Sequence, residues 1–309
     1  MRVILAPTAD LAREFSGQKE VVLSVEAEYG DFVAEGTLYT AAHHQGSGPF
    51  AGRHVVKGGR PAPCNDPSIP LAGKWDHVLI SHVDLDTIGG VMRAGGQHQD
   101  LFGPEYQEFW DTAEFVDTHG AHKLPEDHPQ AERMYAVWAF IKRHRETYPH
   151  DSVVEVTEFL RLAAEAIGAI LTGQDTEFKA QELMGHGKYM KEDMDTLSEA
   201  SWVQTFGHGT PAIIAVRVSD QFTSNLYTDP EGTLCAAVVA FNTVQGSITI
   251  SLADPVEGVS CRDLVQSLWG DEAGGHEGIA GSPRGQRMGI AELLEVAQKL
   301  HDKLPNRRL

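Results

Sequence analysis

Cysteine is scarce in this chain, and its placement argues against two classes of protein. The 309 residues include only three cysteines, Cys64, Cys235 and Cys261, and no two of them form a CxxC pair. A disulfide framework and a zinc ribbon both need more cysteines at closer spacing. We therefore expect a reducing, cytoplasmic setting. Because no activating base adjoins Cys64 in the sequence, we do not expect a catalytic thiol there.

Long apolar runs are missing as well. The apolar run near Met1 is too short for a signal peptide, and no window is long enough to cross a membrane. Hydrophobic residues still make up 41% of the chain, which excludes a disordered protein and allows a large core. The length of the chain favours two domains.

Positive charge is the third deficit. The chain has 25 Lys and Arg against 44 Asp and Glu, which gives a formal net charge of -19. A surface this acidic disfavours long nucleic acid as the main partner, because phosphate backbones are bound by clustered Lys and Arg. A small phosphorylated ligand, held by metal ions and one or two arginines, remains compatible with it.

The residues that carry chemistry begin in the stretch 78–90. A short apolar run, typical of a buried parallel strand, leads into His82-Val83-Asp84-Leu85-Asp86, and a helix is predicted over 87–94. In open α/β sheets, functional residues lie just past the carboxyl ends of the strands. Two carboxylates this close, with no Lys or Arg before Arg93, repel one another unless a cation lies between them. The alternative is a polar loop of solvated acids.

A second cluster of the same kind follows. Residues 113–116 are predicted to form a short strand, which runs into Asp117, His119 and His122. Two strand ends that both carry acids and imidazoles are what a dinuclear metal site requires. An apolar helix predicted over 153–171 then places Asp175 just past its carboxyl end. An Asp there opposes the helix dipole, and a bound metal would relieve the conflict, although a surface Asp is also tolerated.

The other elements are predicted from periodicity and turn residues. We expect helices over 104–112, 129–148, 178–202, 220–227, 260–269 and 290–304, and strands over 21–25, 31–42, 212–218, 233–241 and 247–252. A loop rich in Gly and Pro runs from His43 and His44 to Pro70, and at most one of these histidines is expected to reach a site. A Gly-rich stretch, 274–285, contains Gly274, Gly275, His276 and Arg284. It is predicted to bind an anion; the alternative is a flexible surface turn.

Three of these stretches together resemble the DHH phosphoesterases. Residues 80–86, Ile-Ser-His-Val-Asp-Leu-Asp, resemble the first motif of the family, and residues 170–178 resemble its fourth motif, a loop with Asp-Thr. Residues 274–281 resemble the Gly-Gly-His-x-x-Ala-Ala-Gly signature of the DHH-associated carboxyl-terminal domain. The resemblance covers roughly residues 76–300.

The resemblance implies an α/β fold with two domains. A parallel-sheet N-terminal catalytic domain is expected over 1–185, including an unusual N-terminal extension over 1–75. A linker over 186–210 joins it to a smaller α/β C-terminal domain over 211–309, and a cleft is expected between the two domains. The role of the extension stays open.

The chain also departs from the pattern of the family. The Asp-His-His motif is absent, and residues 117–122 are either a stretched version of it or a merger of two motifs. Asp100 and Asp111 are alternatives for the Asp of the second motif. Ala253 stands where the associated domain often has an arginine. These departures leave the substrate and the reaction open.

By this resemblance, the chain is a manganese-dependent phosphohydrolase with two ions, Mg2+ or Co2+ being alternatives. Carboxylates and imidazoles suit such ions. The resemblance implies one ion on His82, Asp84 and Asp117, and another on Asp86, Asp117, His119 and Asp175; which of His119 and His122 is a ligand stays open. A hydroxide activated by the metals would attack phosphorus, with Asp86 and His122 as catalytic residues. The expected substrate is a short oligonucleotide or a nucleotide phosphate, whose remote end would contact Gly274, Gly275, His276 and Arg284.

Two other functions stay open. The chain is alternatively a non-catalytic nucleotide-binding sensor that has lost a metal, or a metal-dependent hydrolase of a substrate without phosphate. The sequence does not fix the oligomeric state, and a homodimer is one of the alternatives.

Overall fold

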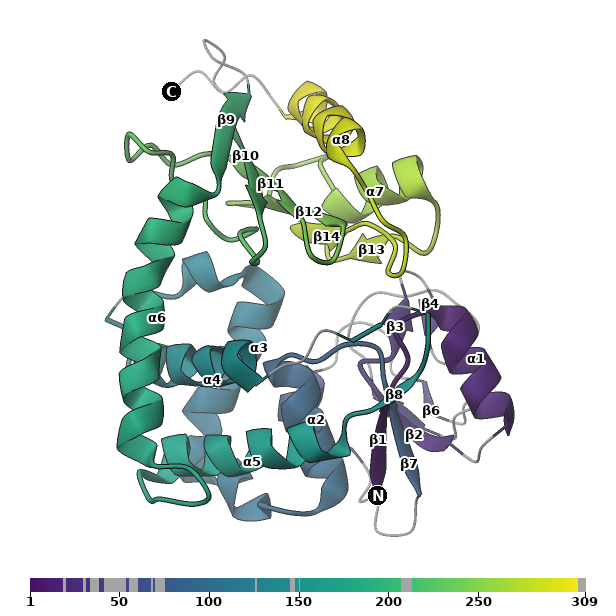
Figure 1. Ribbon diagram of the computed structural model, residues 1–309, viewed down its shortest axis with the longest axis vertical. Helices are drawn as coiled ribbons and strands as arrows, with labels where there is room; N and C mark the ends of the chain where they lie inside the picture. Colours follow the sequence, from purple (N-terminus) through teal and green to yellow (C-terminus); the bar gives the residue numbers. More distant parts are fainter. Residues whose placement is uncertain are drawn as a thin grey trace. The chain divides into compact units, whose positions relative to one another are not determined.

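The computed structural model describes residues 1–18, 21–29, 32–33, 39–41, 54–55, 61–67, 69, 76–125, 127–144, 148–149, 151–206 and 213–304. The chain divides into two compact units, the first of residues 1–119 and 123–192, the second of residues 120–122 and 193–309. Each unit has its own sheet and its own hydrophobic core (Figure 1). The predicted α/β class, with a parallel sheet in the first part of the chain and a further α/β part after it, is confirmed.

The sheet of the first unit has β7 near its centre. Its strand order is β6-β5-β2-β7-β1-β8, and the described pairings are parallel except that of β8 with β1. The strands are β1 Arg2–Leu5, β2 Val21–Val25, β5 Tyr39–Ala41, β6 His54–Val55, β7 His77–Ile80 and β8 Val154–Glu155, beside a hairpin of β3 Glu28–Tyr29 and β4 Phe32–Val33. The predicted strands at 21–25 and 78–80 are confirmed. Of the strand predicted over 31–42, residues 32–33 and 39–41 are extended, and the others lie outside the described residues.

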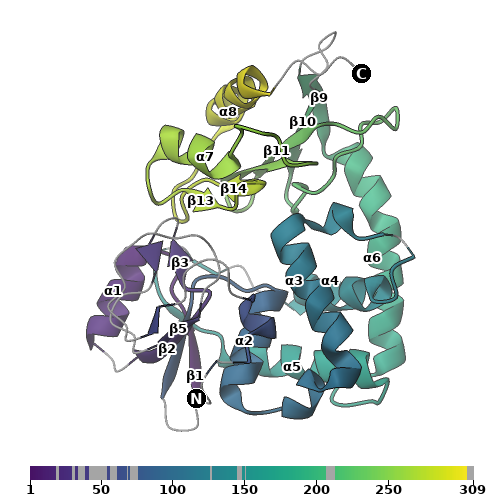
Figure 2. The ribbon, with the colours of Figure 1, turned by 180° about the vertical axis from the view of Figure 1, so that it is seen from behind.

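Both faces of β7 are buried, as its apolar run predicts. Val78 and Ile80 pack in the core that also contains α2 (Leu85–Gly95). Leu79 packs on the opposite face with Ala12 of α1 (Ala9–Gln18). Figure 2 shows α1 and α2 on opposite sides of this sheet. Helix α1 and strand β1 were not among the predicted elements.

The helices that follow α2 are mostly those expected. They are α3 Gln107–His119, α4 Ala131–His144, α5 Thr157–Thr172 and α6 Ala180–Ala200, with 3-10 turns η1 Pro63–Asn65, η2 Gln99–Phe102, η3 Pro104–Tyr106 and η4 Ala121–Lys123. The strand predicted over 113–116 is wrong, because α3 continues to His119. Phe109, Trp110 and Ala113 are buried at helical spacing, which is the period of a helix packed by one face. Within the described parts of the chain, none of the helices has the length and apolar character needed to cross a bilayer.

The second unit is a mixed sheet with helices on one face. The strand order is β13-β14-β12-β11-β10-β9, with β10 and β11 parallel. Its elements are β9 Trp202–Phe206, β10 Ile214–Ser219, β11 Ala237–Asn242, β12 Ser247–Leu252, α7 Cys261–Trp269, β13 Gly274–Gly275, β14 Ile279–Gly281 and α8 Ile290–Lys303. Residues of α7 and α8 share a core with alternate residues of β10, β11 and β12. The predicted strand at 247–252 and the predicted helices at 260–269 and 290–304 are confirmed. The strands predicted over 212–218 and 233–241 are confirmed over 214–218 and 237–241; residues 233–236 are not part of a strand, and residue 212 lies outside the described residues.

The helix predicted over 220–227 is wrong, and a buried arginine explains why. Residues 220–227 form turns. The guanidinium of Arg217, which is fully buried, donates to the carbonyl oxygens of Leu226 at 2.7 Å and Thr228 at 2.6 Å. These hydrogen bonds hold residues 220–227 in turns through Arg217. They also give the buried guanidinium hydrogen-bond partners, without which its burial would be costly.

Candidate functional site

The His-x-Asp-x-Asp stretch joins the carboxyl end of β7 to the amino end of α2. Strand β7 ends at Ile80, and α2 begins at Leu85. Asp84 is the N-cap of α2, and its Oδ1 accepts from the amide of Thr87 at 2.9 Å. Strands β1 and β7 are neighbours that lead into α1 and α2 on opposite faces of the sheet. In open α/β sheets, ligands bind at the point where neighbouring connections diverge in this way.

The imidazole of His82 lies between two partners in this stretch. Its Nε2 is 2.8 Å from Oδ2 of Asp84, and its Nδ1 is 2.9 Å from Oγ of Ser81. Burial raises the pKa of Asp84, but the charge of His82 and the hydrogen bonds from His82 and Thr87 outweigh it and hold that pKa well below its ordinary value. Asp84 is therefore a carboxylate near neutral pH, paired with His82.

Asp86 is the buried acid of the stretch. It lies in the first turn of α2 and is 4% exposed. Its Oδ1 accepts from the backbone amide of Cys64 at 2.7 Å. A Cβ at Gly89 would lie only 2.4 Å from Cβ of Cys64, so glycine at that position lets η1 pack directly on α2. Asp86 is thus hydrogen-bonded to a segment that lies far from it in the sequence.

The negative charges of carboxylates on α2 and α3 act on the buried Cys64 thiol. Burial raises the pKa of this thiol, and the negative charges of Asp86, Asp117 and Glu114 raise it further. Two of the predicted ligands, Asp86 and Asp117, therefore act on the same buried group. Glu114, whose charge also raises the pKa of the Cys64 thiol, was not predicted as a site residue. Residues 114 and 117 share one face of a helix, but the strand predicted over 113–116 concealed this spacing.

The remaining residues of the second cluster have other neighbours. His119 ends α3, where its ring stacks on Phe115 at 4.7 Å and its Nδ1 is 3.1 Å from the carbonyl oxygen of Phe115. His122 belongs to the second unit, where its Nε2 is 3.0 Å from the carbonyl oxygen of Ala253. Its ring lies 4.1 Å from that of Tyr227. Since a carbonyl oxygen only accepts, Nε2 of His122 carries a proton in this contact.

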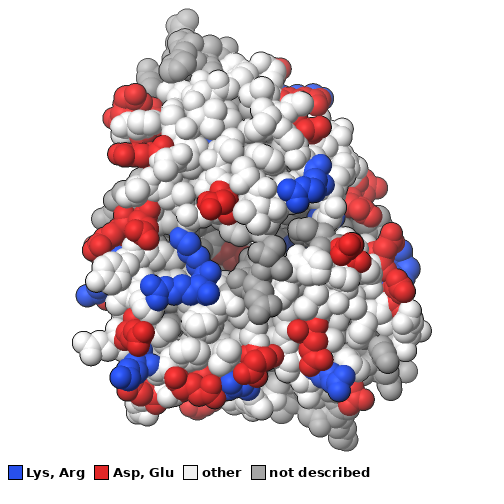
Figure 3. All heavy atoms as spheres, in the orientation of Figure 1, with Lys and Arg blue, Asp and Glu red and all other residues white. Residues whose placement is uncertain are grey.

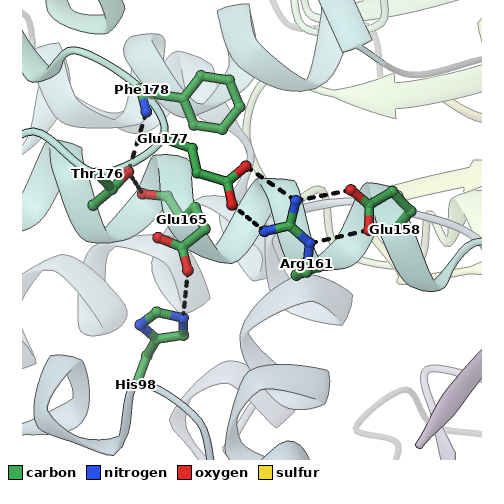
Figure 4. A network of polar contacts seen from close by, with 7 residues as sticks. All are labelled: His98, Glu158, Arg161, Glu165, Thr176, Glu177 and Phe178. Atoms are coloured by element: carbon green, nitrogen blue, oxygen red, sulfur yellow. Dashed lines mark hydrogen bonds and ion pairs between the residues drawn. The ribbon is translucent and has the colours of Figure 1, made fainter.

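Asp175 lies in a loop that is linked to α5 by a hydrogen bond and an ion pair. Thr176 donates from Oγ1 to the carbonyl oxygen of Glu165 at 3.0 Å, and Glu177 forms an ion pair with Arg161 at 2.6 Å (Figure 4). The same Arg161 pairs with Glu158, and His98 approaches Glu165 at 3.4 Å. Asp175 itself accepts on Oδ1 from the amide of Ala180, the first residue of α6, at 3.0 Å.

Replacing Asp175 tests this capping contact. We expect Asp175→Ala to lower the free energy of unfolding by about 1 kcal/mol, because it removes the acceptor at the start of α6. Asp175→Asn retains an oxygen acceptor and should stay near the wild-type value. Thermal and urea unfolding of both variants measure the difference. An Ala variant as stable as the wild type would show that Oδ1 does not act as a cap.

The Gly-Gly-His stretch forms a β-hairpin at the edge of the second sheet. Strands β13 and β14 pair, and the amide of His276 donates to the carbonyl oxygen of Ile279 at 2.7 Å. Gly274 pairs with Gly281, and Gly275 pairs with Ala280. Arg284 lies beyond the hairpin and is exposed. The carbonyl of Glu277 accepts from the amide of Cys261, which ties the hairpin to the start of α7.

The chemistry of the predicted ligands, carboxylates with imidazoles, suits a hard divalent cation. Among the described residues, no group of three or more His, Cys, Asp and Glu could hold a metal ion. Asp111, an alternative for the second-motif Asp, accepts on Oδ1 from Asn65 and Gln107. Asp100, the other alternative, lies in η2. His43 and His44 lie outside the described residues.

Comparison with known proteins adds one structural likeness. No family model matches the sequence, and no curated protein matches it either. Among solved structures, the chain is similar to a pGpG-specific phosphodiesterase, PggH from Vibrio cholerae, with a TM-score of 0.35 and 10% sequence identity. The match covers 81% of this chain and 91% of that one. We draw no argument from a likeness of this size.

Proposed function

We propose that the chain is a phosphoesterase that hydrolyses a small phosphorylated substrate, such as a short oligonucleotide or a nucleotide phosphate. The observation that carries the proposal is the position of His82, Asp84 and Asp86. They follow the carboxyl end of a central parallel strand, where its connection diverges from that of β1. Their residue types and spacing resemble those of the first motif of the DHH phosphoesterases.

A requirement for a divalent metal is part of this proposal. Asp84 is ionised, and Asp86 and Asp117 act on the same thiol from two helices. A phosphate group is repelled by carboxylates unless a cation compensates the charge. Hard oxygen donors with imidazole favour Mn2+ or a similar ion, and we propose two ions per chain from the sequence resemblance. Asp84 and Asp86 would help to hold them.

The surface charge agrees with a small substrate. Acidic side chains are spread over the face in Figure 3, with Lys and Arg interspersed and fewer in the chain as a whole. Long nucleic acid needs a continuous basic track along its backbone. A small substrate needs only local compensation of its charge.

A non-catalytic sensor of nucleotides is the second candidate. The observation that favours it is that the predicted ligands in the described residues are engaged by the protein itself. His82 pairs with Asp84, Asp86 accepts from the Cys64 amide, and His119 contacts its own helix. A binding module has no need to release these contacts.

The two candidates are separated by turnover. The purified chain is incubated with a linear dinucleotide, a mononucleotide and pyrophosphate, with Mn2+, Mg2+, Co2+ or a chelator. We expect phosphate or nucleotide release with Mn2+ and none with the chelator. Nucleotide binding without release would favour the sensor. Neither binding nor release would point to a metal-dependent hydrolase of a substrate without phosphate.

A further inference from the structure

We propose that His122 is a positioning residue, and not the catalytic residue that the sequence resemblance implies. Its imidazole docks on the ring of Tyr227 and on the backbone carbonyl of Ala253, and it thereby holds the turn that follows α3. The docking itself takes place within the second unit. Its consequence for turnover rests on the proposed function.

Both nitrogens of the imidazole are directed at the protein. Nε2 donates to the carbonyl oxygen of Ala253 at 3.0 Å. Nδ1 is buried, and a Cβ at Gly120 would lie only 2.7 Å from it. A general acid or base needs a nitrogen within hydrogen-bond reach of the proton that it transfers. The nitrogens of His122 meet its own chain instead, which suits an anchor.

Tyr227 is a rigid platform for the ring of His122. It is 4% exposed, and the two ring centroids lie 4.1 Å apart with the planes tilted by 49°. The hydroxyl of Tyr227 donates to the carbonyl of Leu252 at 3.2 Å, and its own carbonyl accepts from the amide of Cys235 at 2.8 Å. The carbonyls on both sides of it in the chain accept from the buried Arg217. These contacts fix Tyr227 without any contribution from His122.

The sheet face on which Tyr227 packs also fixes the second partner of the imidazole. Ala253 comes directly after β12 and is 3% exposed. Its amide donates to the carbonyl of Ala236 at 2.9 Å, next to β11. The core on this face consists mostly of small side chains, which leaves room for a large ring. The residues buried there with Tyr227 are Ala215, Cys235, Val238, Ala240 and Ala253.

The docked ring belongs to the turn that ends α3. Gly120 follows the last residue of the helix and has a φ of 91°, a conformation that glycine adopts readily at helix ends. Residues 120–122 are part of the second unit, although the residues on both sides of them are part of the first. Asp117 and His119 precede His122 within five residues. Holding His122 therefore holds the turn into which these two residues lead.

A double-mutant cycle tests the docking. Urea unfolding is measured for His122→Ala, Tyr227→Leu and the double variant. Because residues in contact are not additive, the double variant should lose less stability than the two single losses together. His119→Ala is the matched control, since His119 contacts its own helix, and its loss should add to that of Tyr227→Leu. Additive losses for His122 and Tyr227 would overturn the docking.

NMR of the wild-type chain detects the same contact without a variant of Tyr227. The ring signals of His122 are assigned by their disappearance in His122→Gln. We expect nuclear Overhauser cross-peaks between the ring protons of His122 and those of Tyr227. Their absence overturns the docking even if Tyr227→Leu does not fold.

Activity separates positioning from catalysis. Glutamine cannot replace imidazole as a general acid or base, but its side-chain amide can still donate to the Ala253 carbonyl. With the substrate found in the screen, His122→Ala should lower kcat/KM by up to about 100-fold, the effect of misplacing groups by a small distance. His122→Gln should restore a large part of it. A folded His122→Gln that is as inactive as His122→Ala would show that the imidazole itself is required, and the positioning role would be overturned.

The outcomes separate this inference from the proposed function. If the chain hydrolyses none of the phosphorylated substrates, the proposed function fails, while the unfolding and NMR results still decide the docking. If the chain is active and His122→Ala is as active as the wild type, the positioning role is overturned.

Discussion

The Asp86→Asn variant should be inactive while remaining folded. Asp86 is the acid of the His-x-Asp-x-Asp stretch that is nearly fully buried, and it acts with Asp117 on one buried thiol. Neutralising it removes charge from the centre that we propose to bind divalent metal. We expect kcat/KM to fall by at least about 100-fold, the upper end of the effect seen for groups that only support a ligand.

The Asp86→Asn variant should remain folded, because asparagine retains the hydrogen-bond acceptor for the Cys64 amide. Its Oδ1 can still accept from the amide of Cys64, which Asp86 does at 2.7 Å. The lost charge at the amino end of α2 weakens the interaction with the helix dipole by about 0.3–1 kcal/mol. Thermal unfolding and initial rates with Mn2+ measure both quantities. Glu182→Gln, which neutralises an exposed acid on α6, is the control.

Three results would count against this role. An Asn variant that turns over at the wild-type rate would remove Asp86 from the reaction. A variant that loses activity only in proportion to lost folded protein would make the role structural. Unchanged metal content, measured after dialysis, would show that Asp86 is not needed to hold the ion.

The β7–α2 part of the site could be predicted because its signals are local. The apolar run of β7 is bounded by His82, Asp84 suits a helix N-cap, and the helix begins at the next residue. Gly89 falls within the helix predicted over 87–94, and the structure places it inside α2. It lets Cys64 approach the helix closely, and no local pattern indicates that contact.

The prediction for α3 failed because short segments are ambiguous between strand and helix. The segment Ala-Glu-Phe-Val has residues that suit a strand, and it directly precedes Asp117. Burial of Phe109, Trp110 and Ala113 on one side continues the helix through it. The error matters for function. The prediction placed Asp117 and His119 just past a strand end, whereas in the structure they lie in the last turn of a helix.

Contacts between distant segments could not be predicted from the sequence. The bond from Cys64 to Asp86 joins residues 22 apart, the bond from Ser81 to Glu26 joins residues 55 apart, and the His122 to Ala253 contact spans 131 residues. Each depends on how strands and loops pair in three dimensions. Local patterns thus indicated candidate residues, and the fold determined their partners.

Gly275→Ala should strongly destabilise the hairpin of β13 and β14. Gly275 has a φ of 143°, which side chains rarely adopt, and a Cβ there would lie 2.5 Å from the carbonyl oxygen of Ile279 and 2.8 Å from Cα of Ala280. Both obstacles are backbone atoms of the paired strand, so no flexible side chain can move aside. Strain and overpacking each cost about 1–3 kcal/mol, and we expect a loss of about 3 kcal/mol or more.

Gly278→Ala provides the matched control in the same hairpin. A Cβ at Gly278 has no other atom within 4 Å, so this variant should unfold near the wild-type temperature. Urea unfolding of both variants measures the contrast, and amide exchange at Ala280 and Leu252 localises it to the hairpin and β12. If Gly275→Ala is as stable as Gly278→Ala but binds nucleotide more weakly, glycine is required at 275 by a ligand. If it is destabilised as expected, the close approach of the two strands is sufficient to explain the glycine.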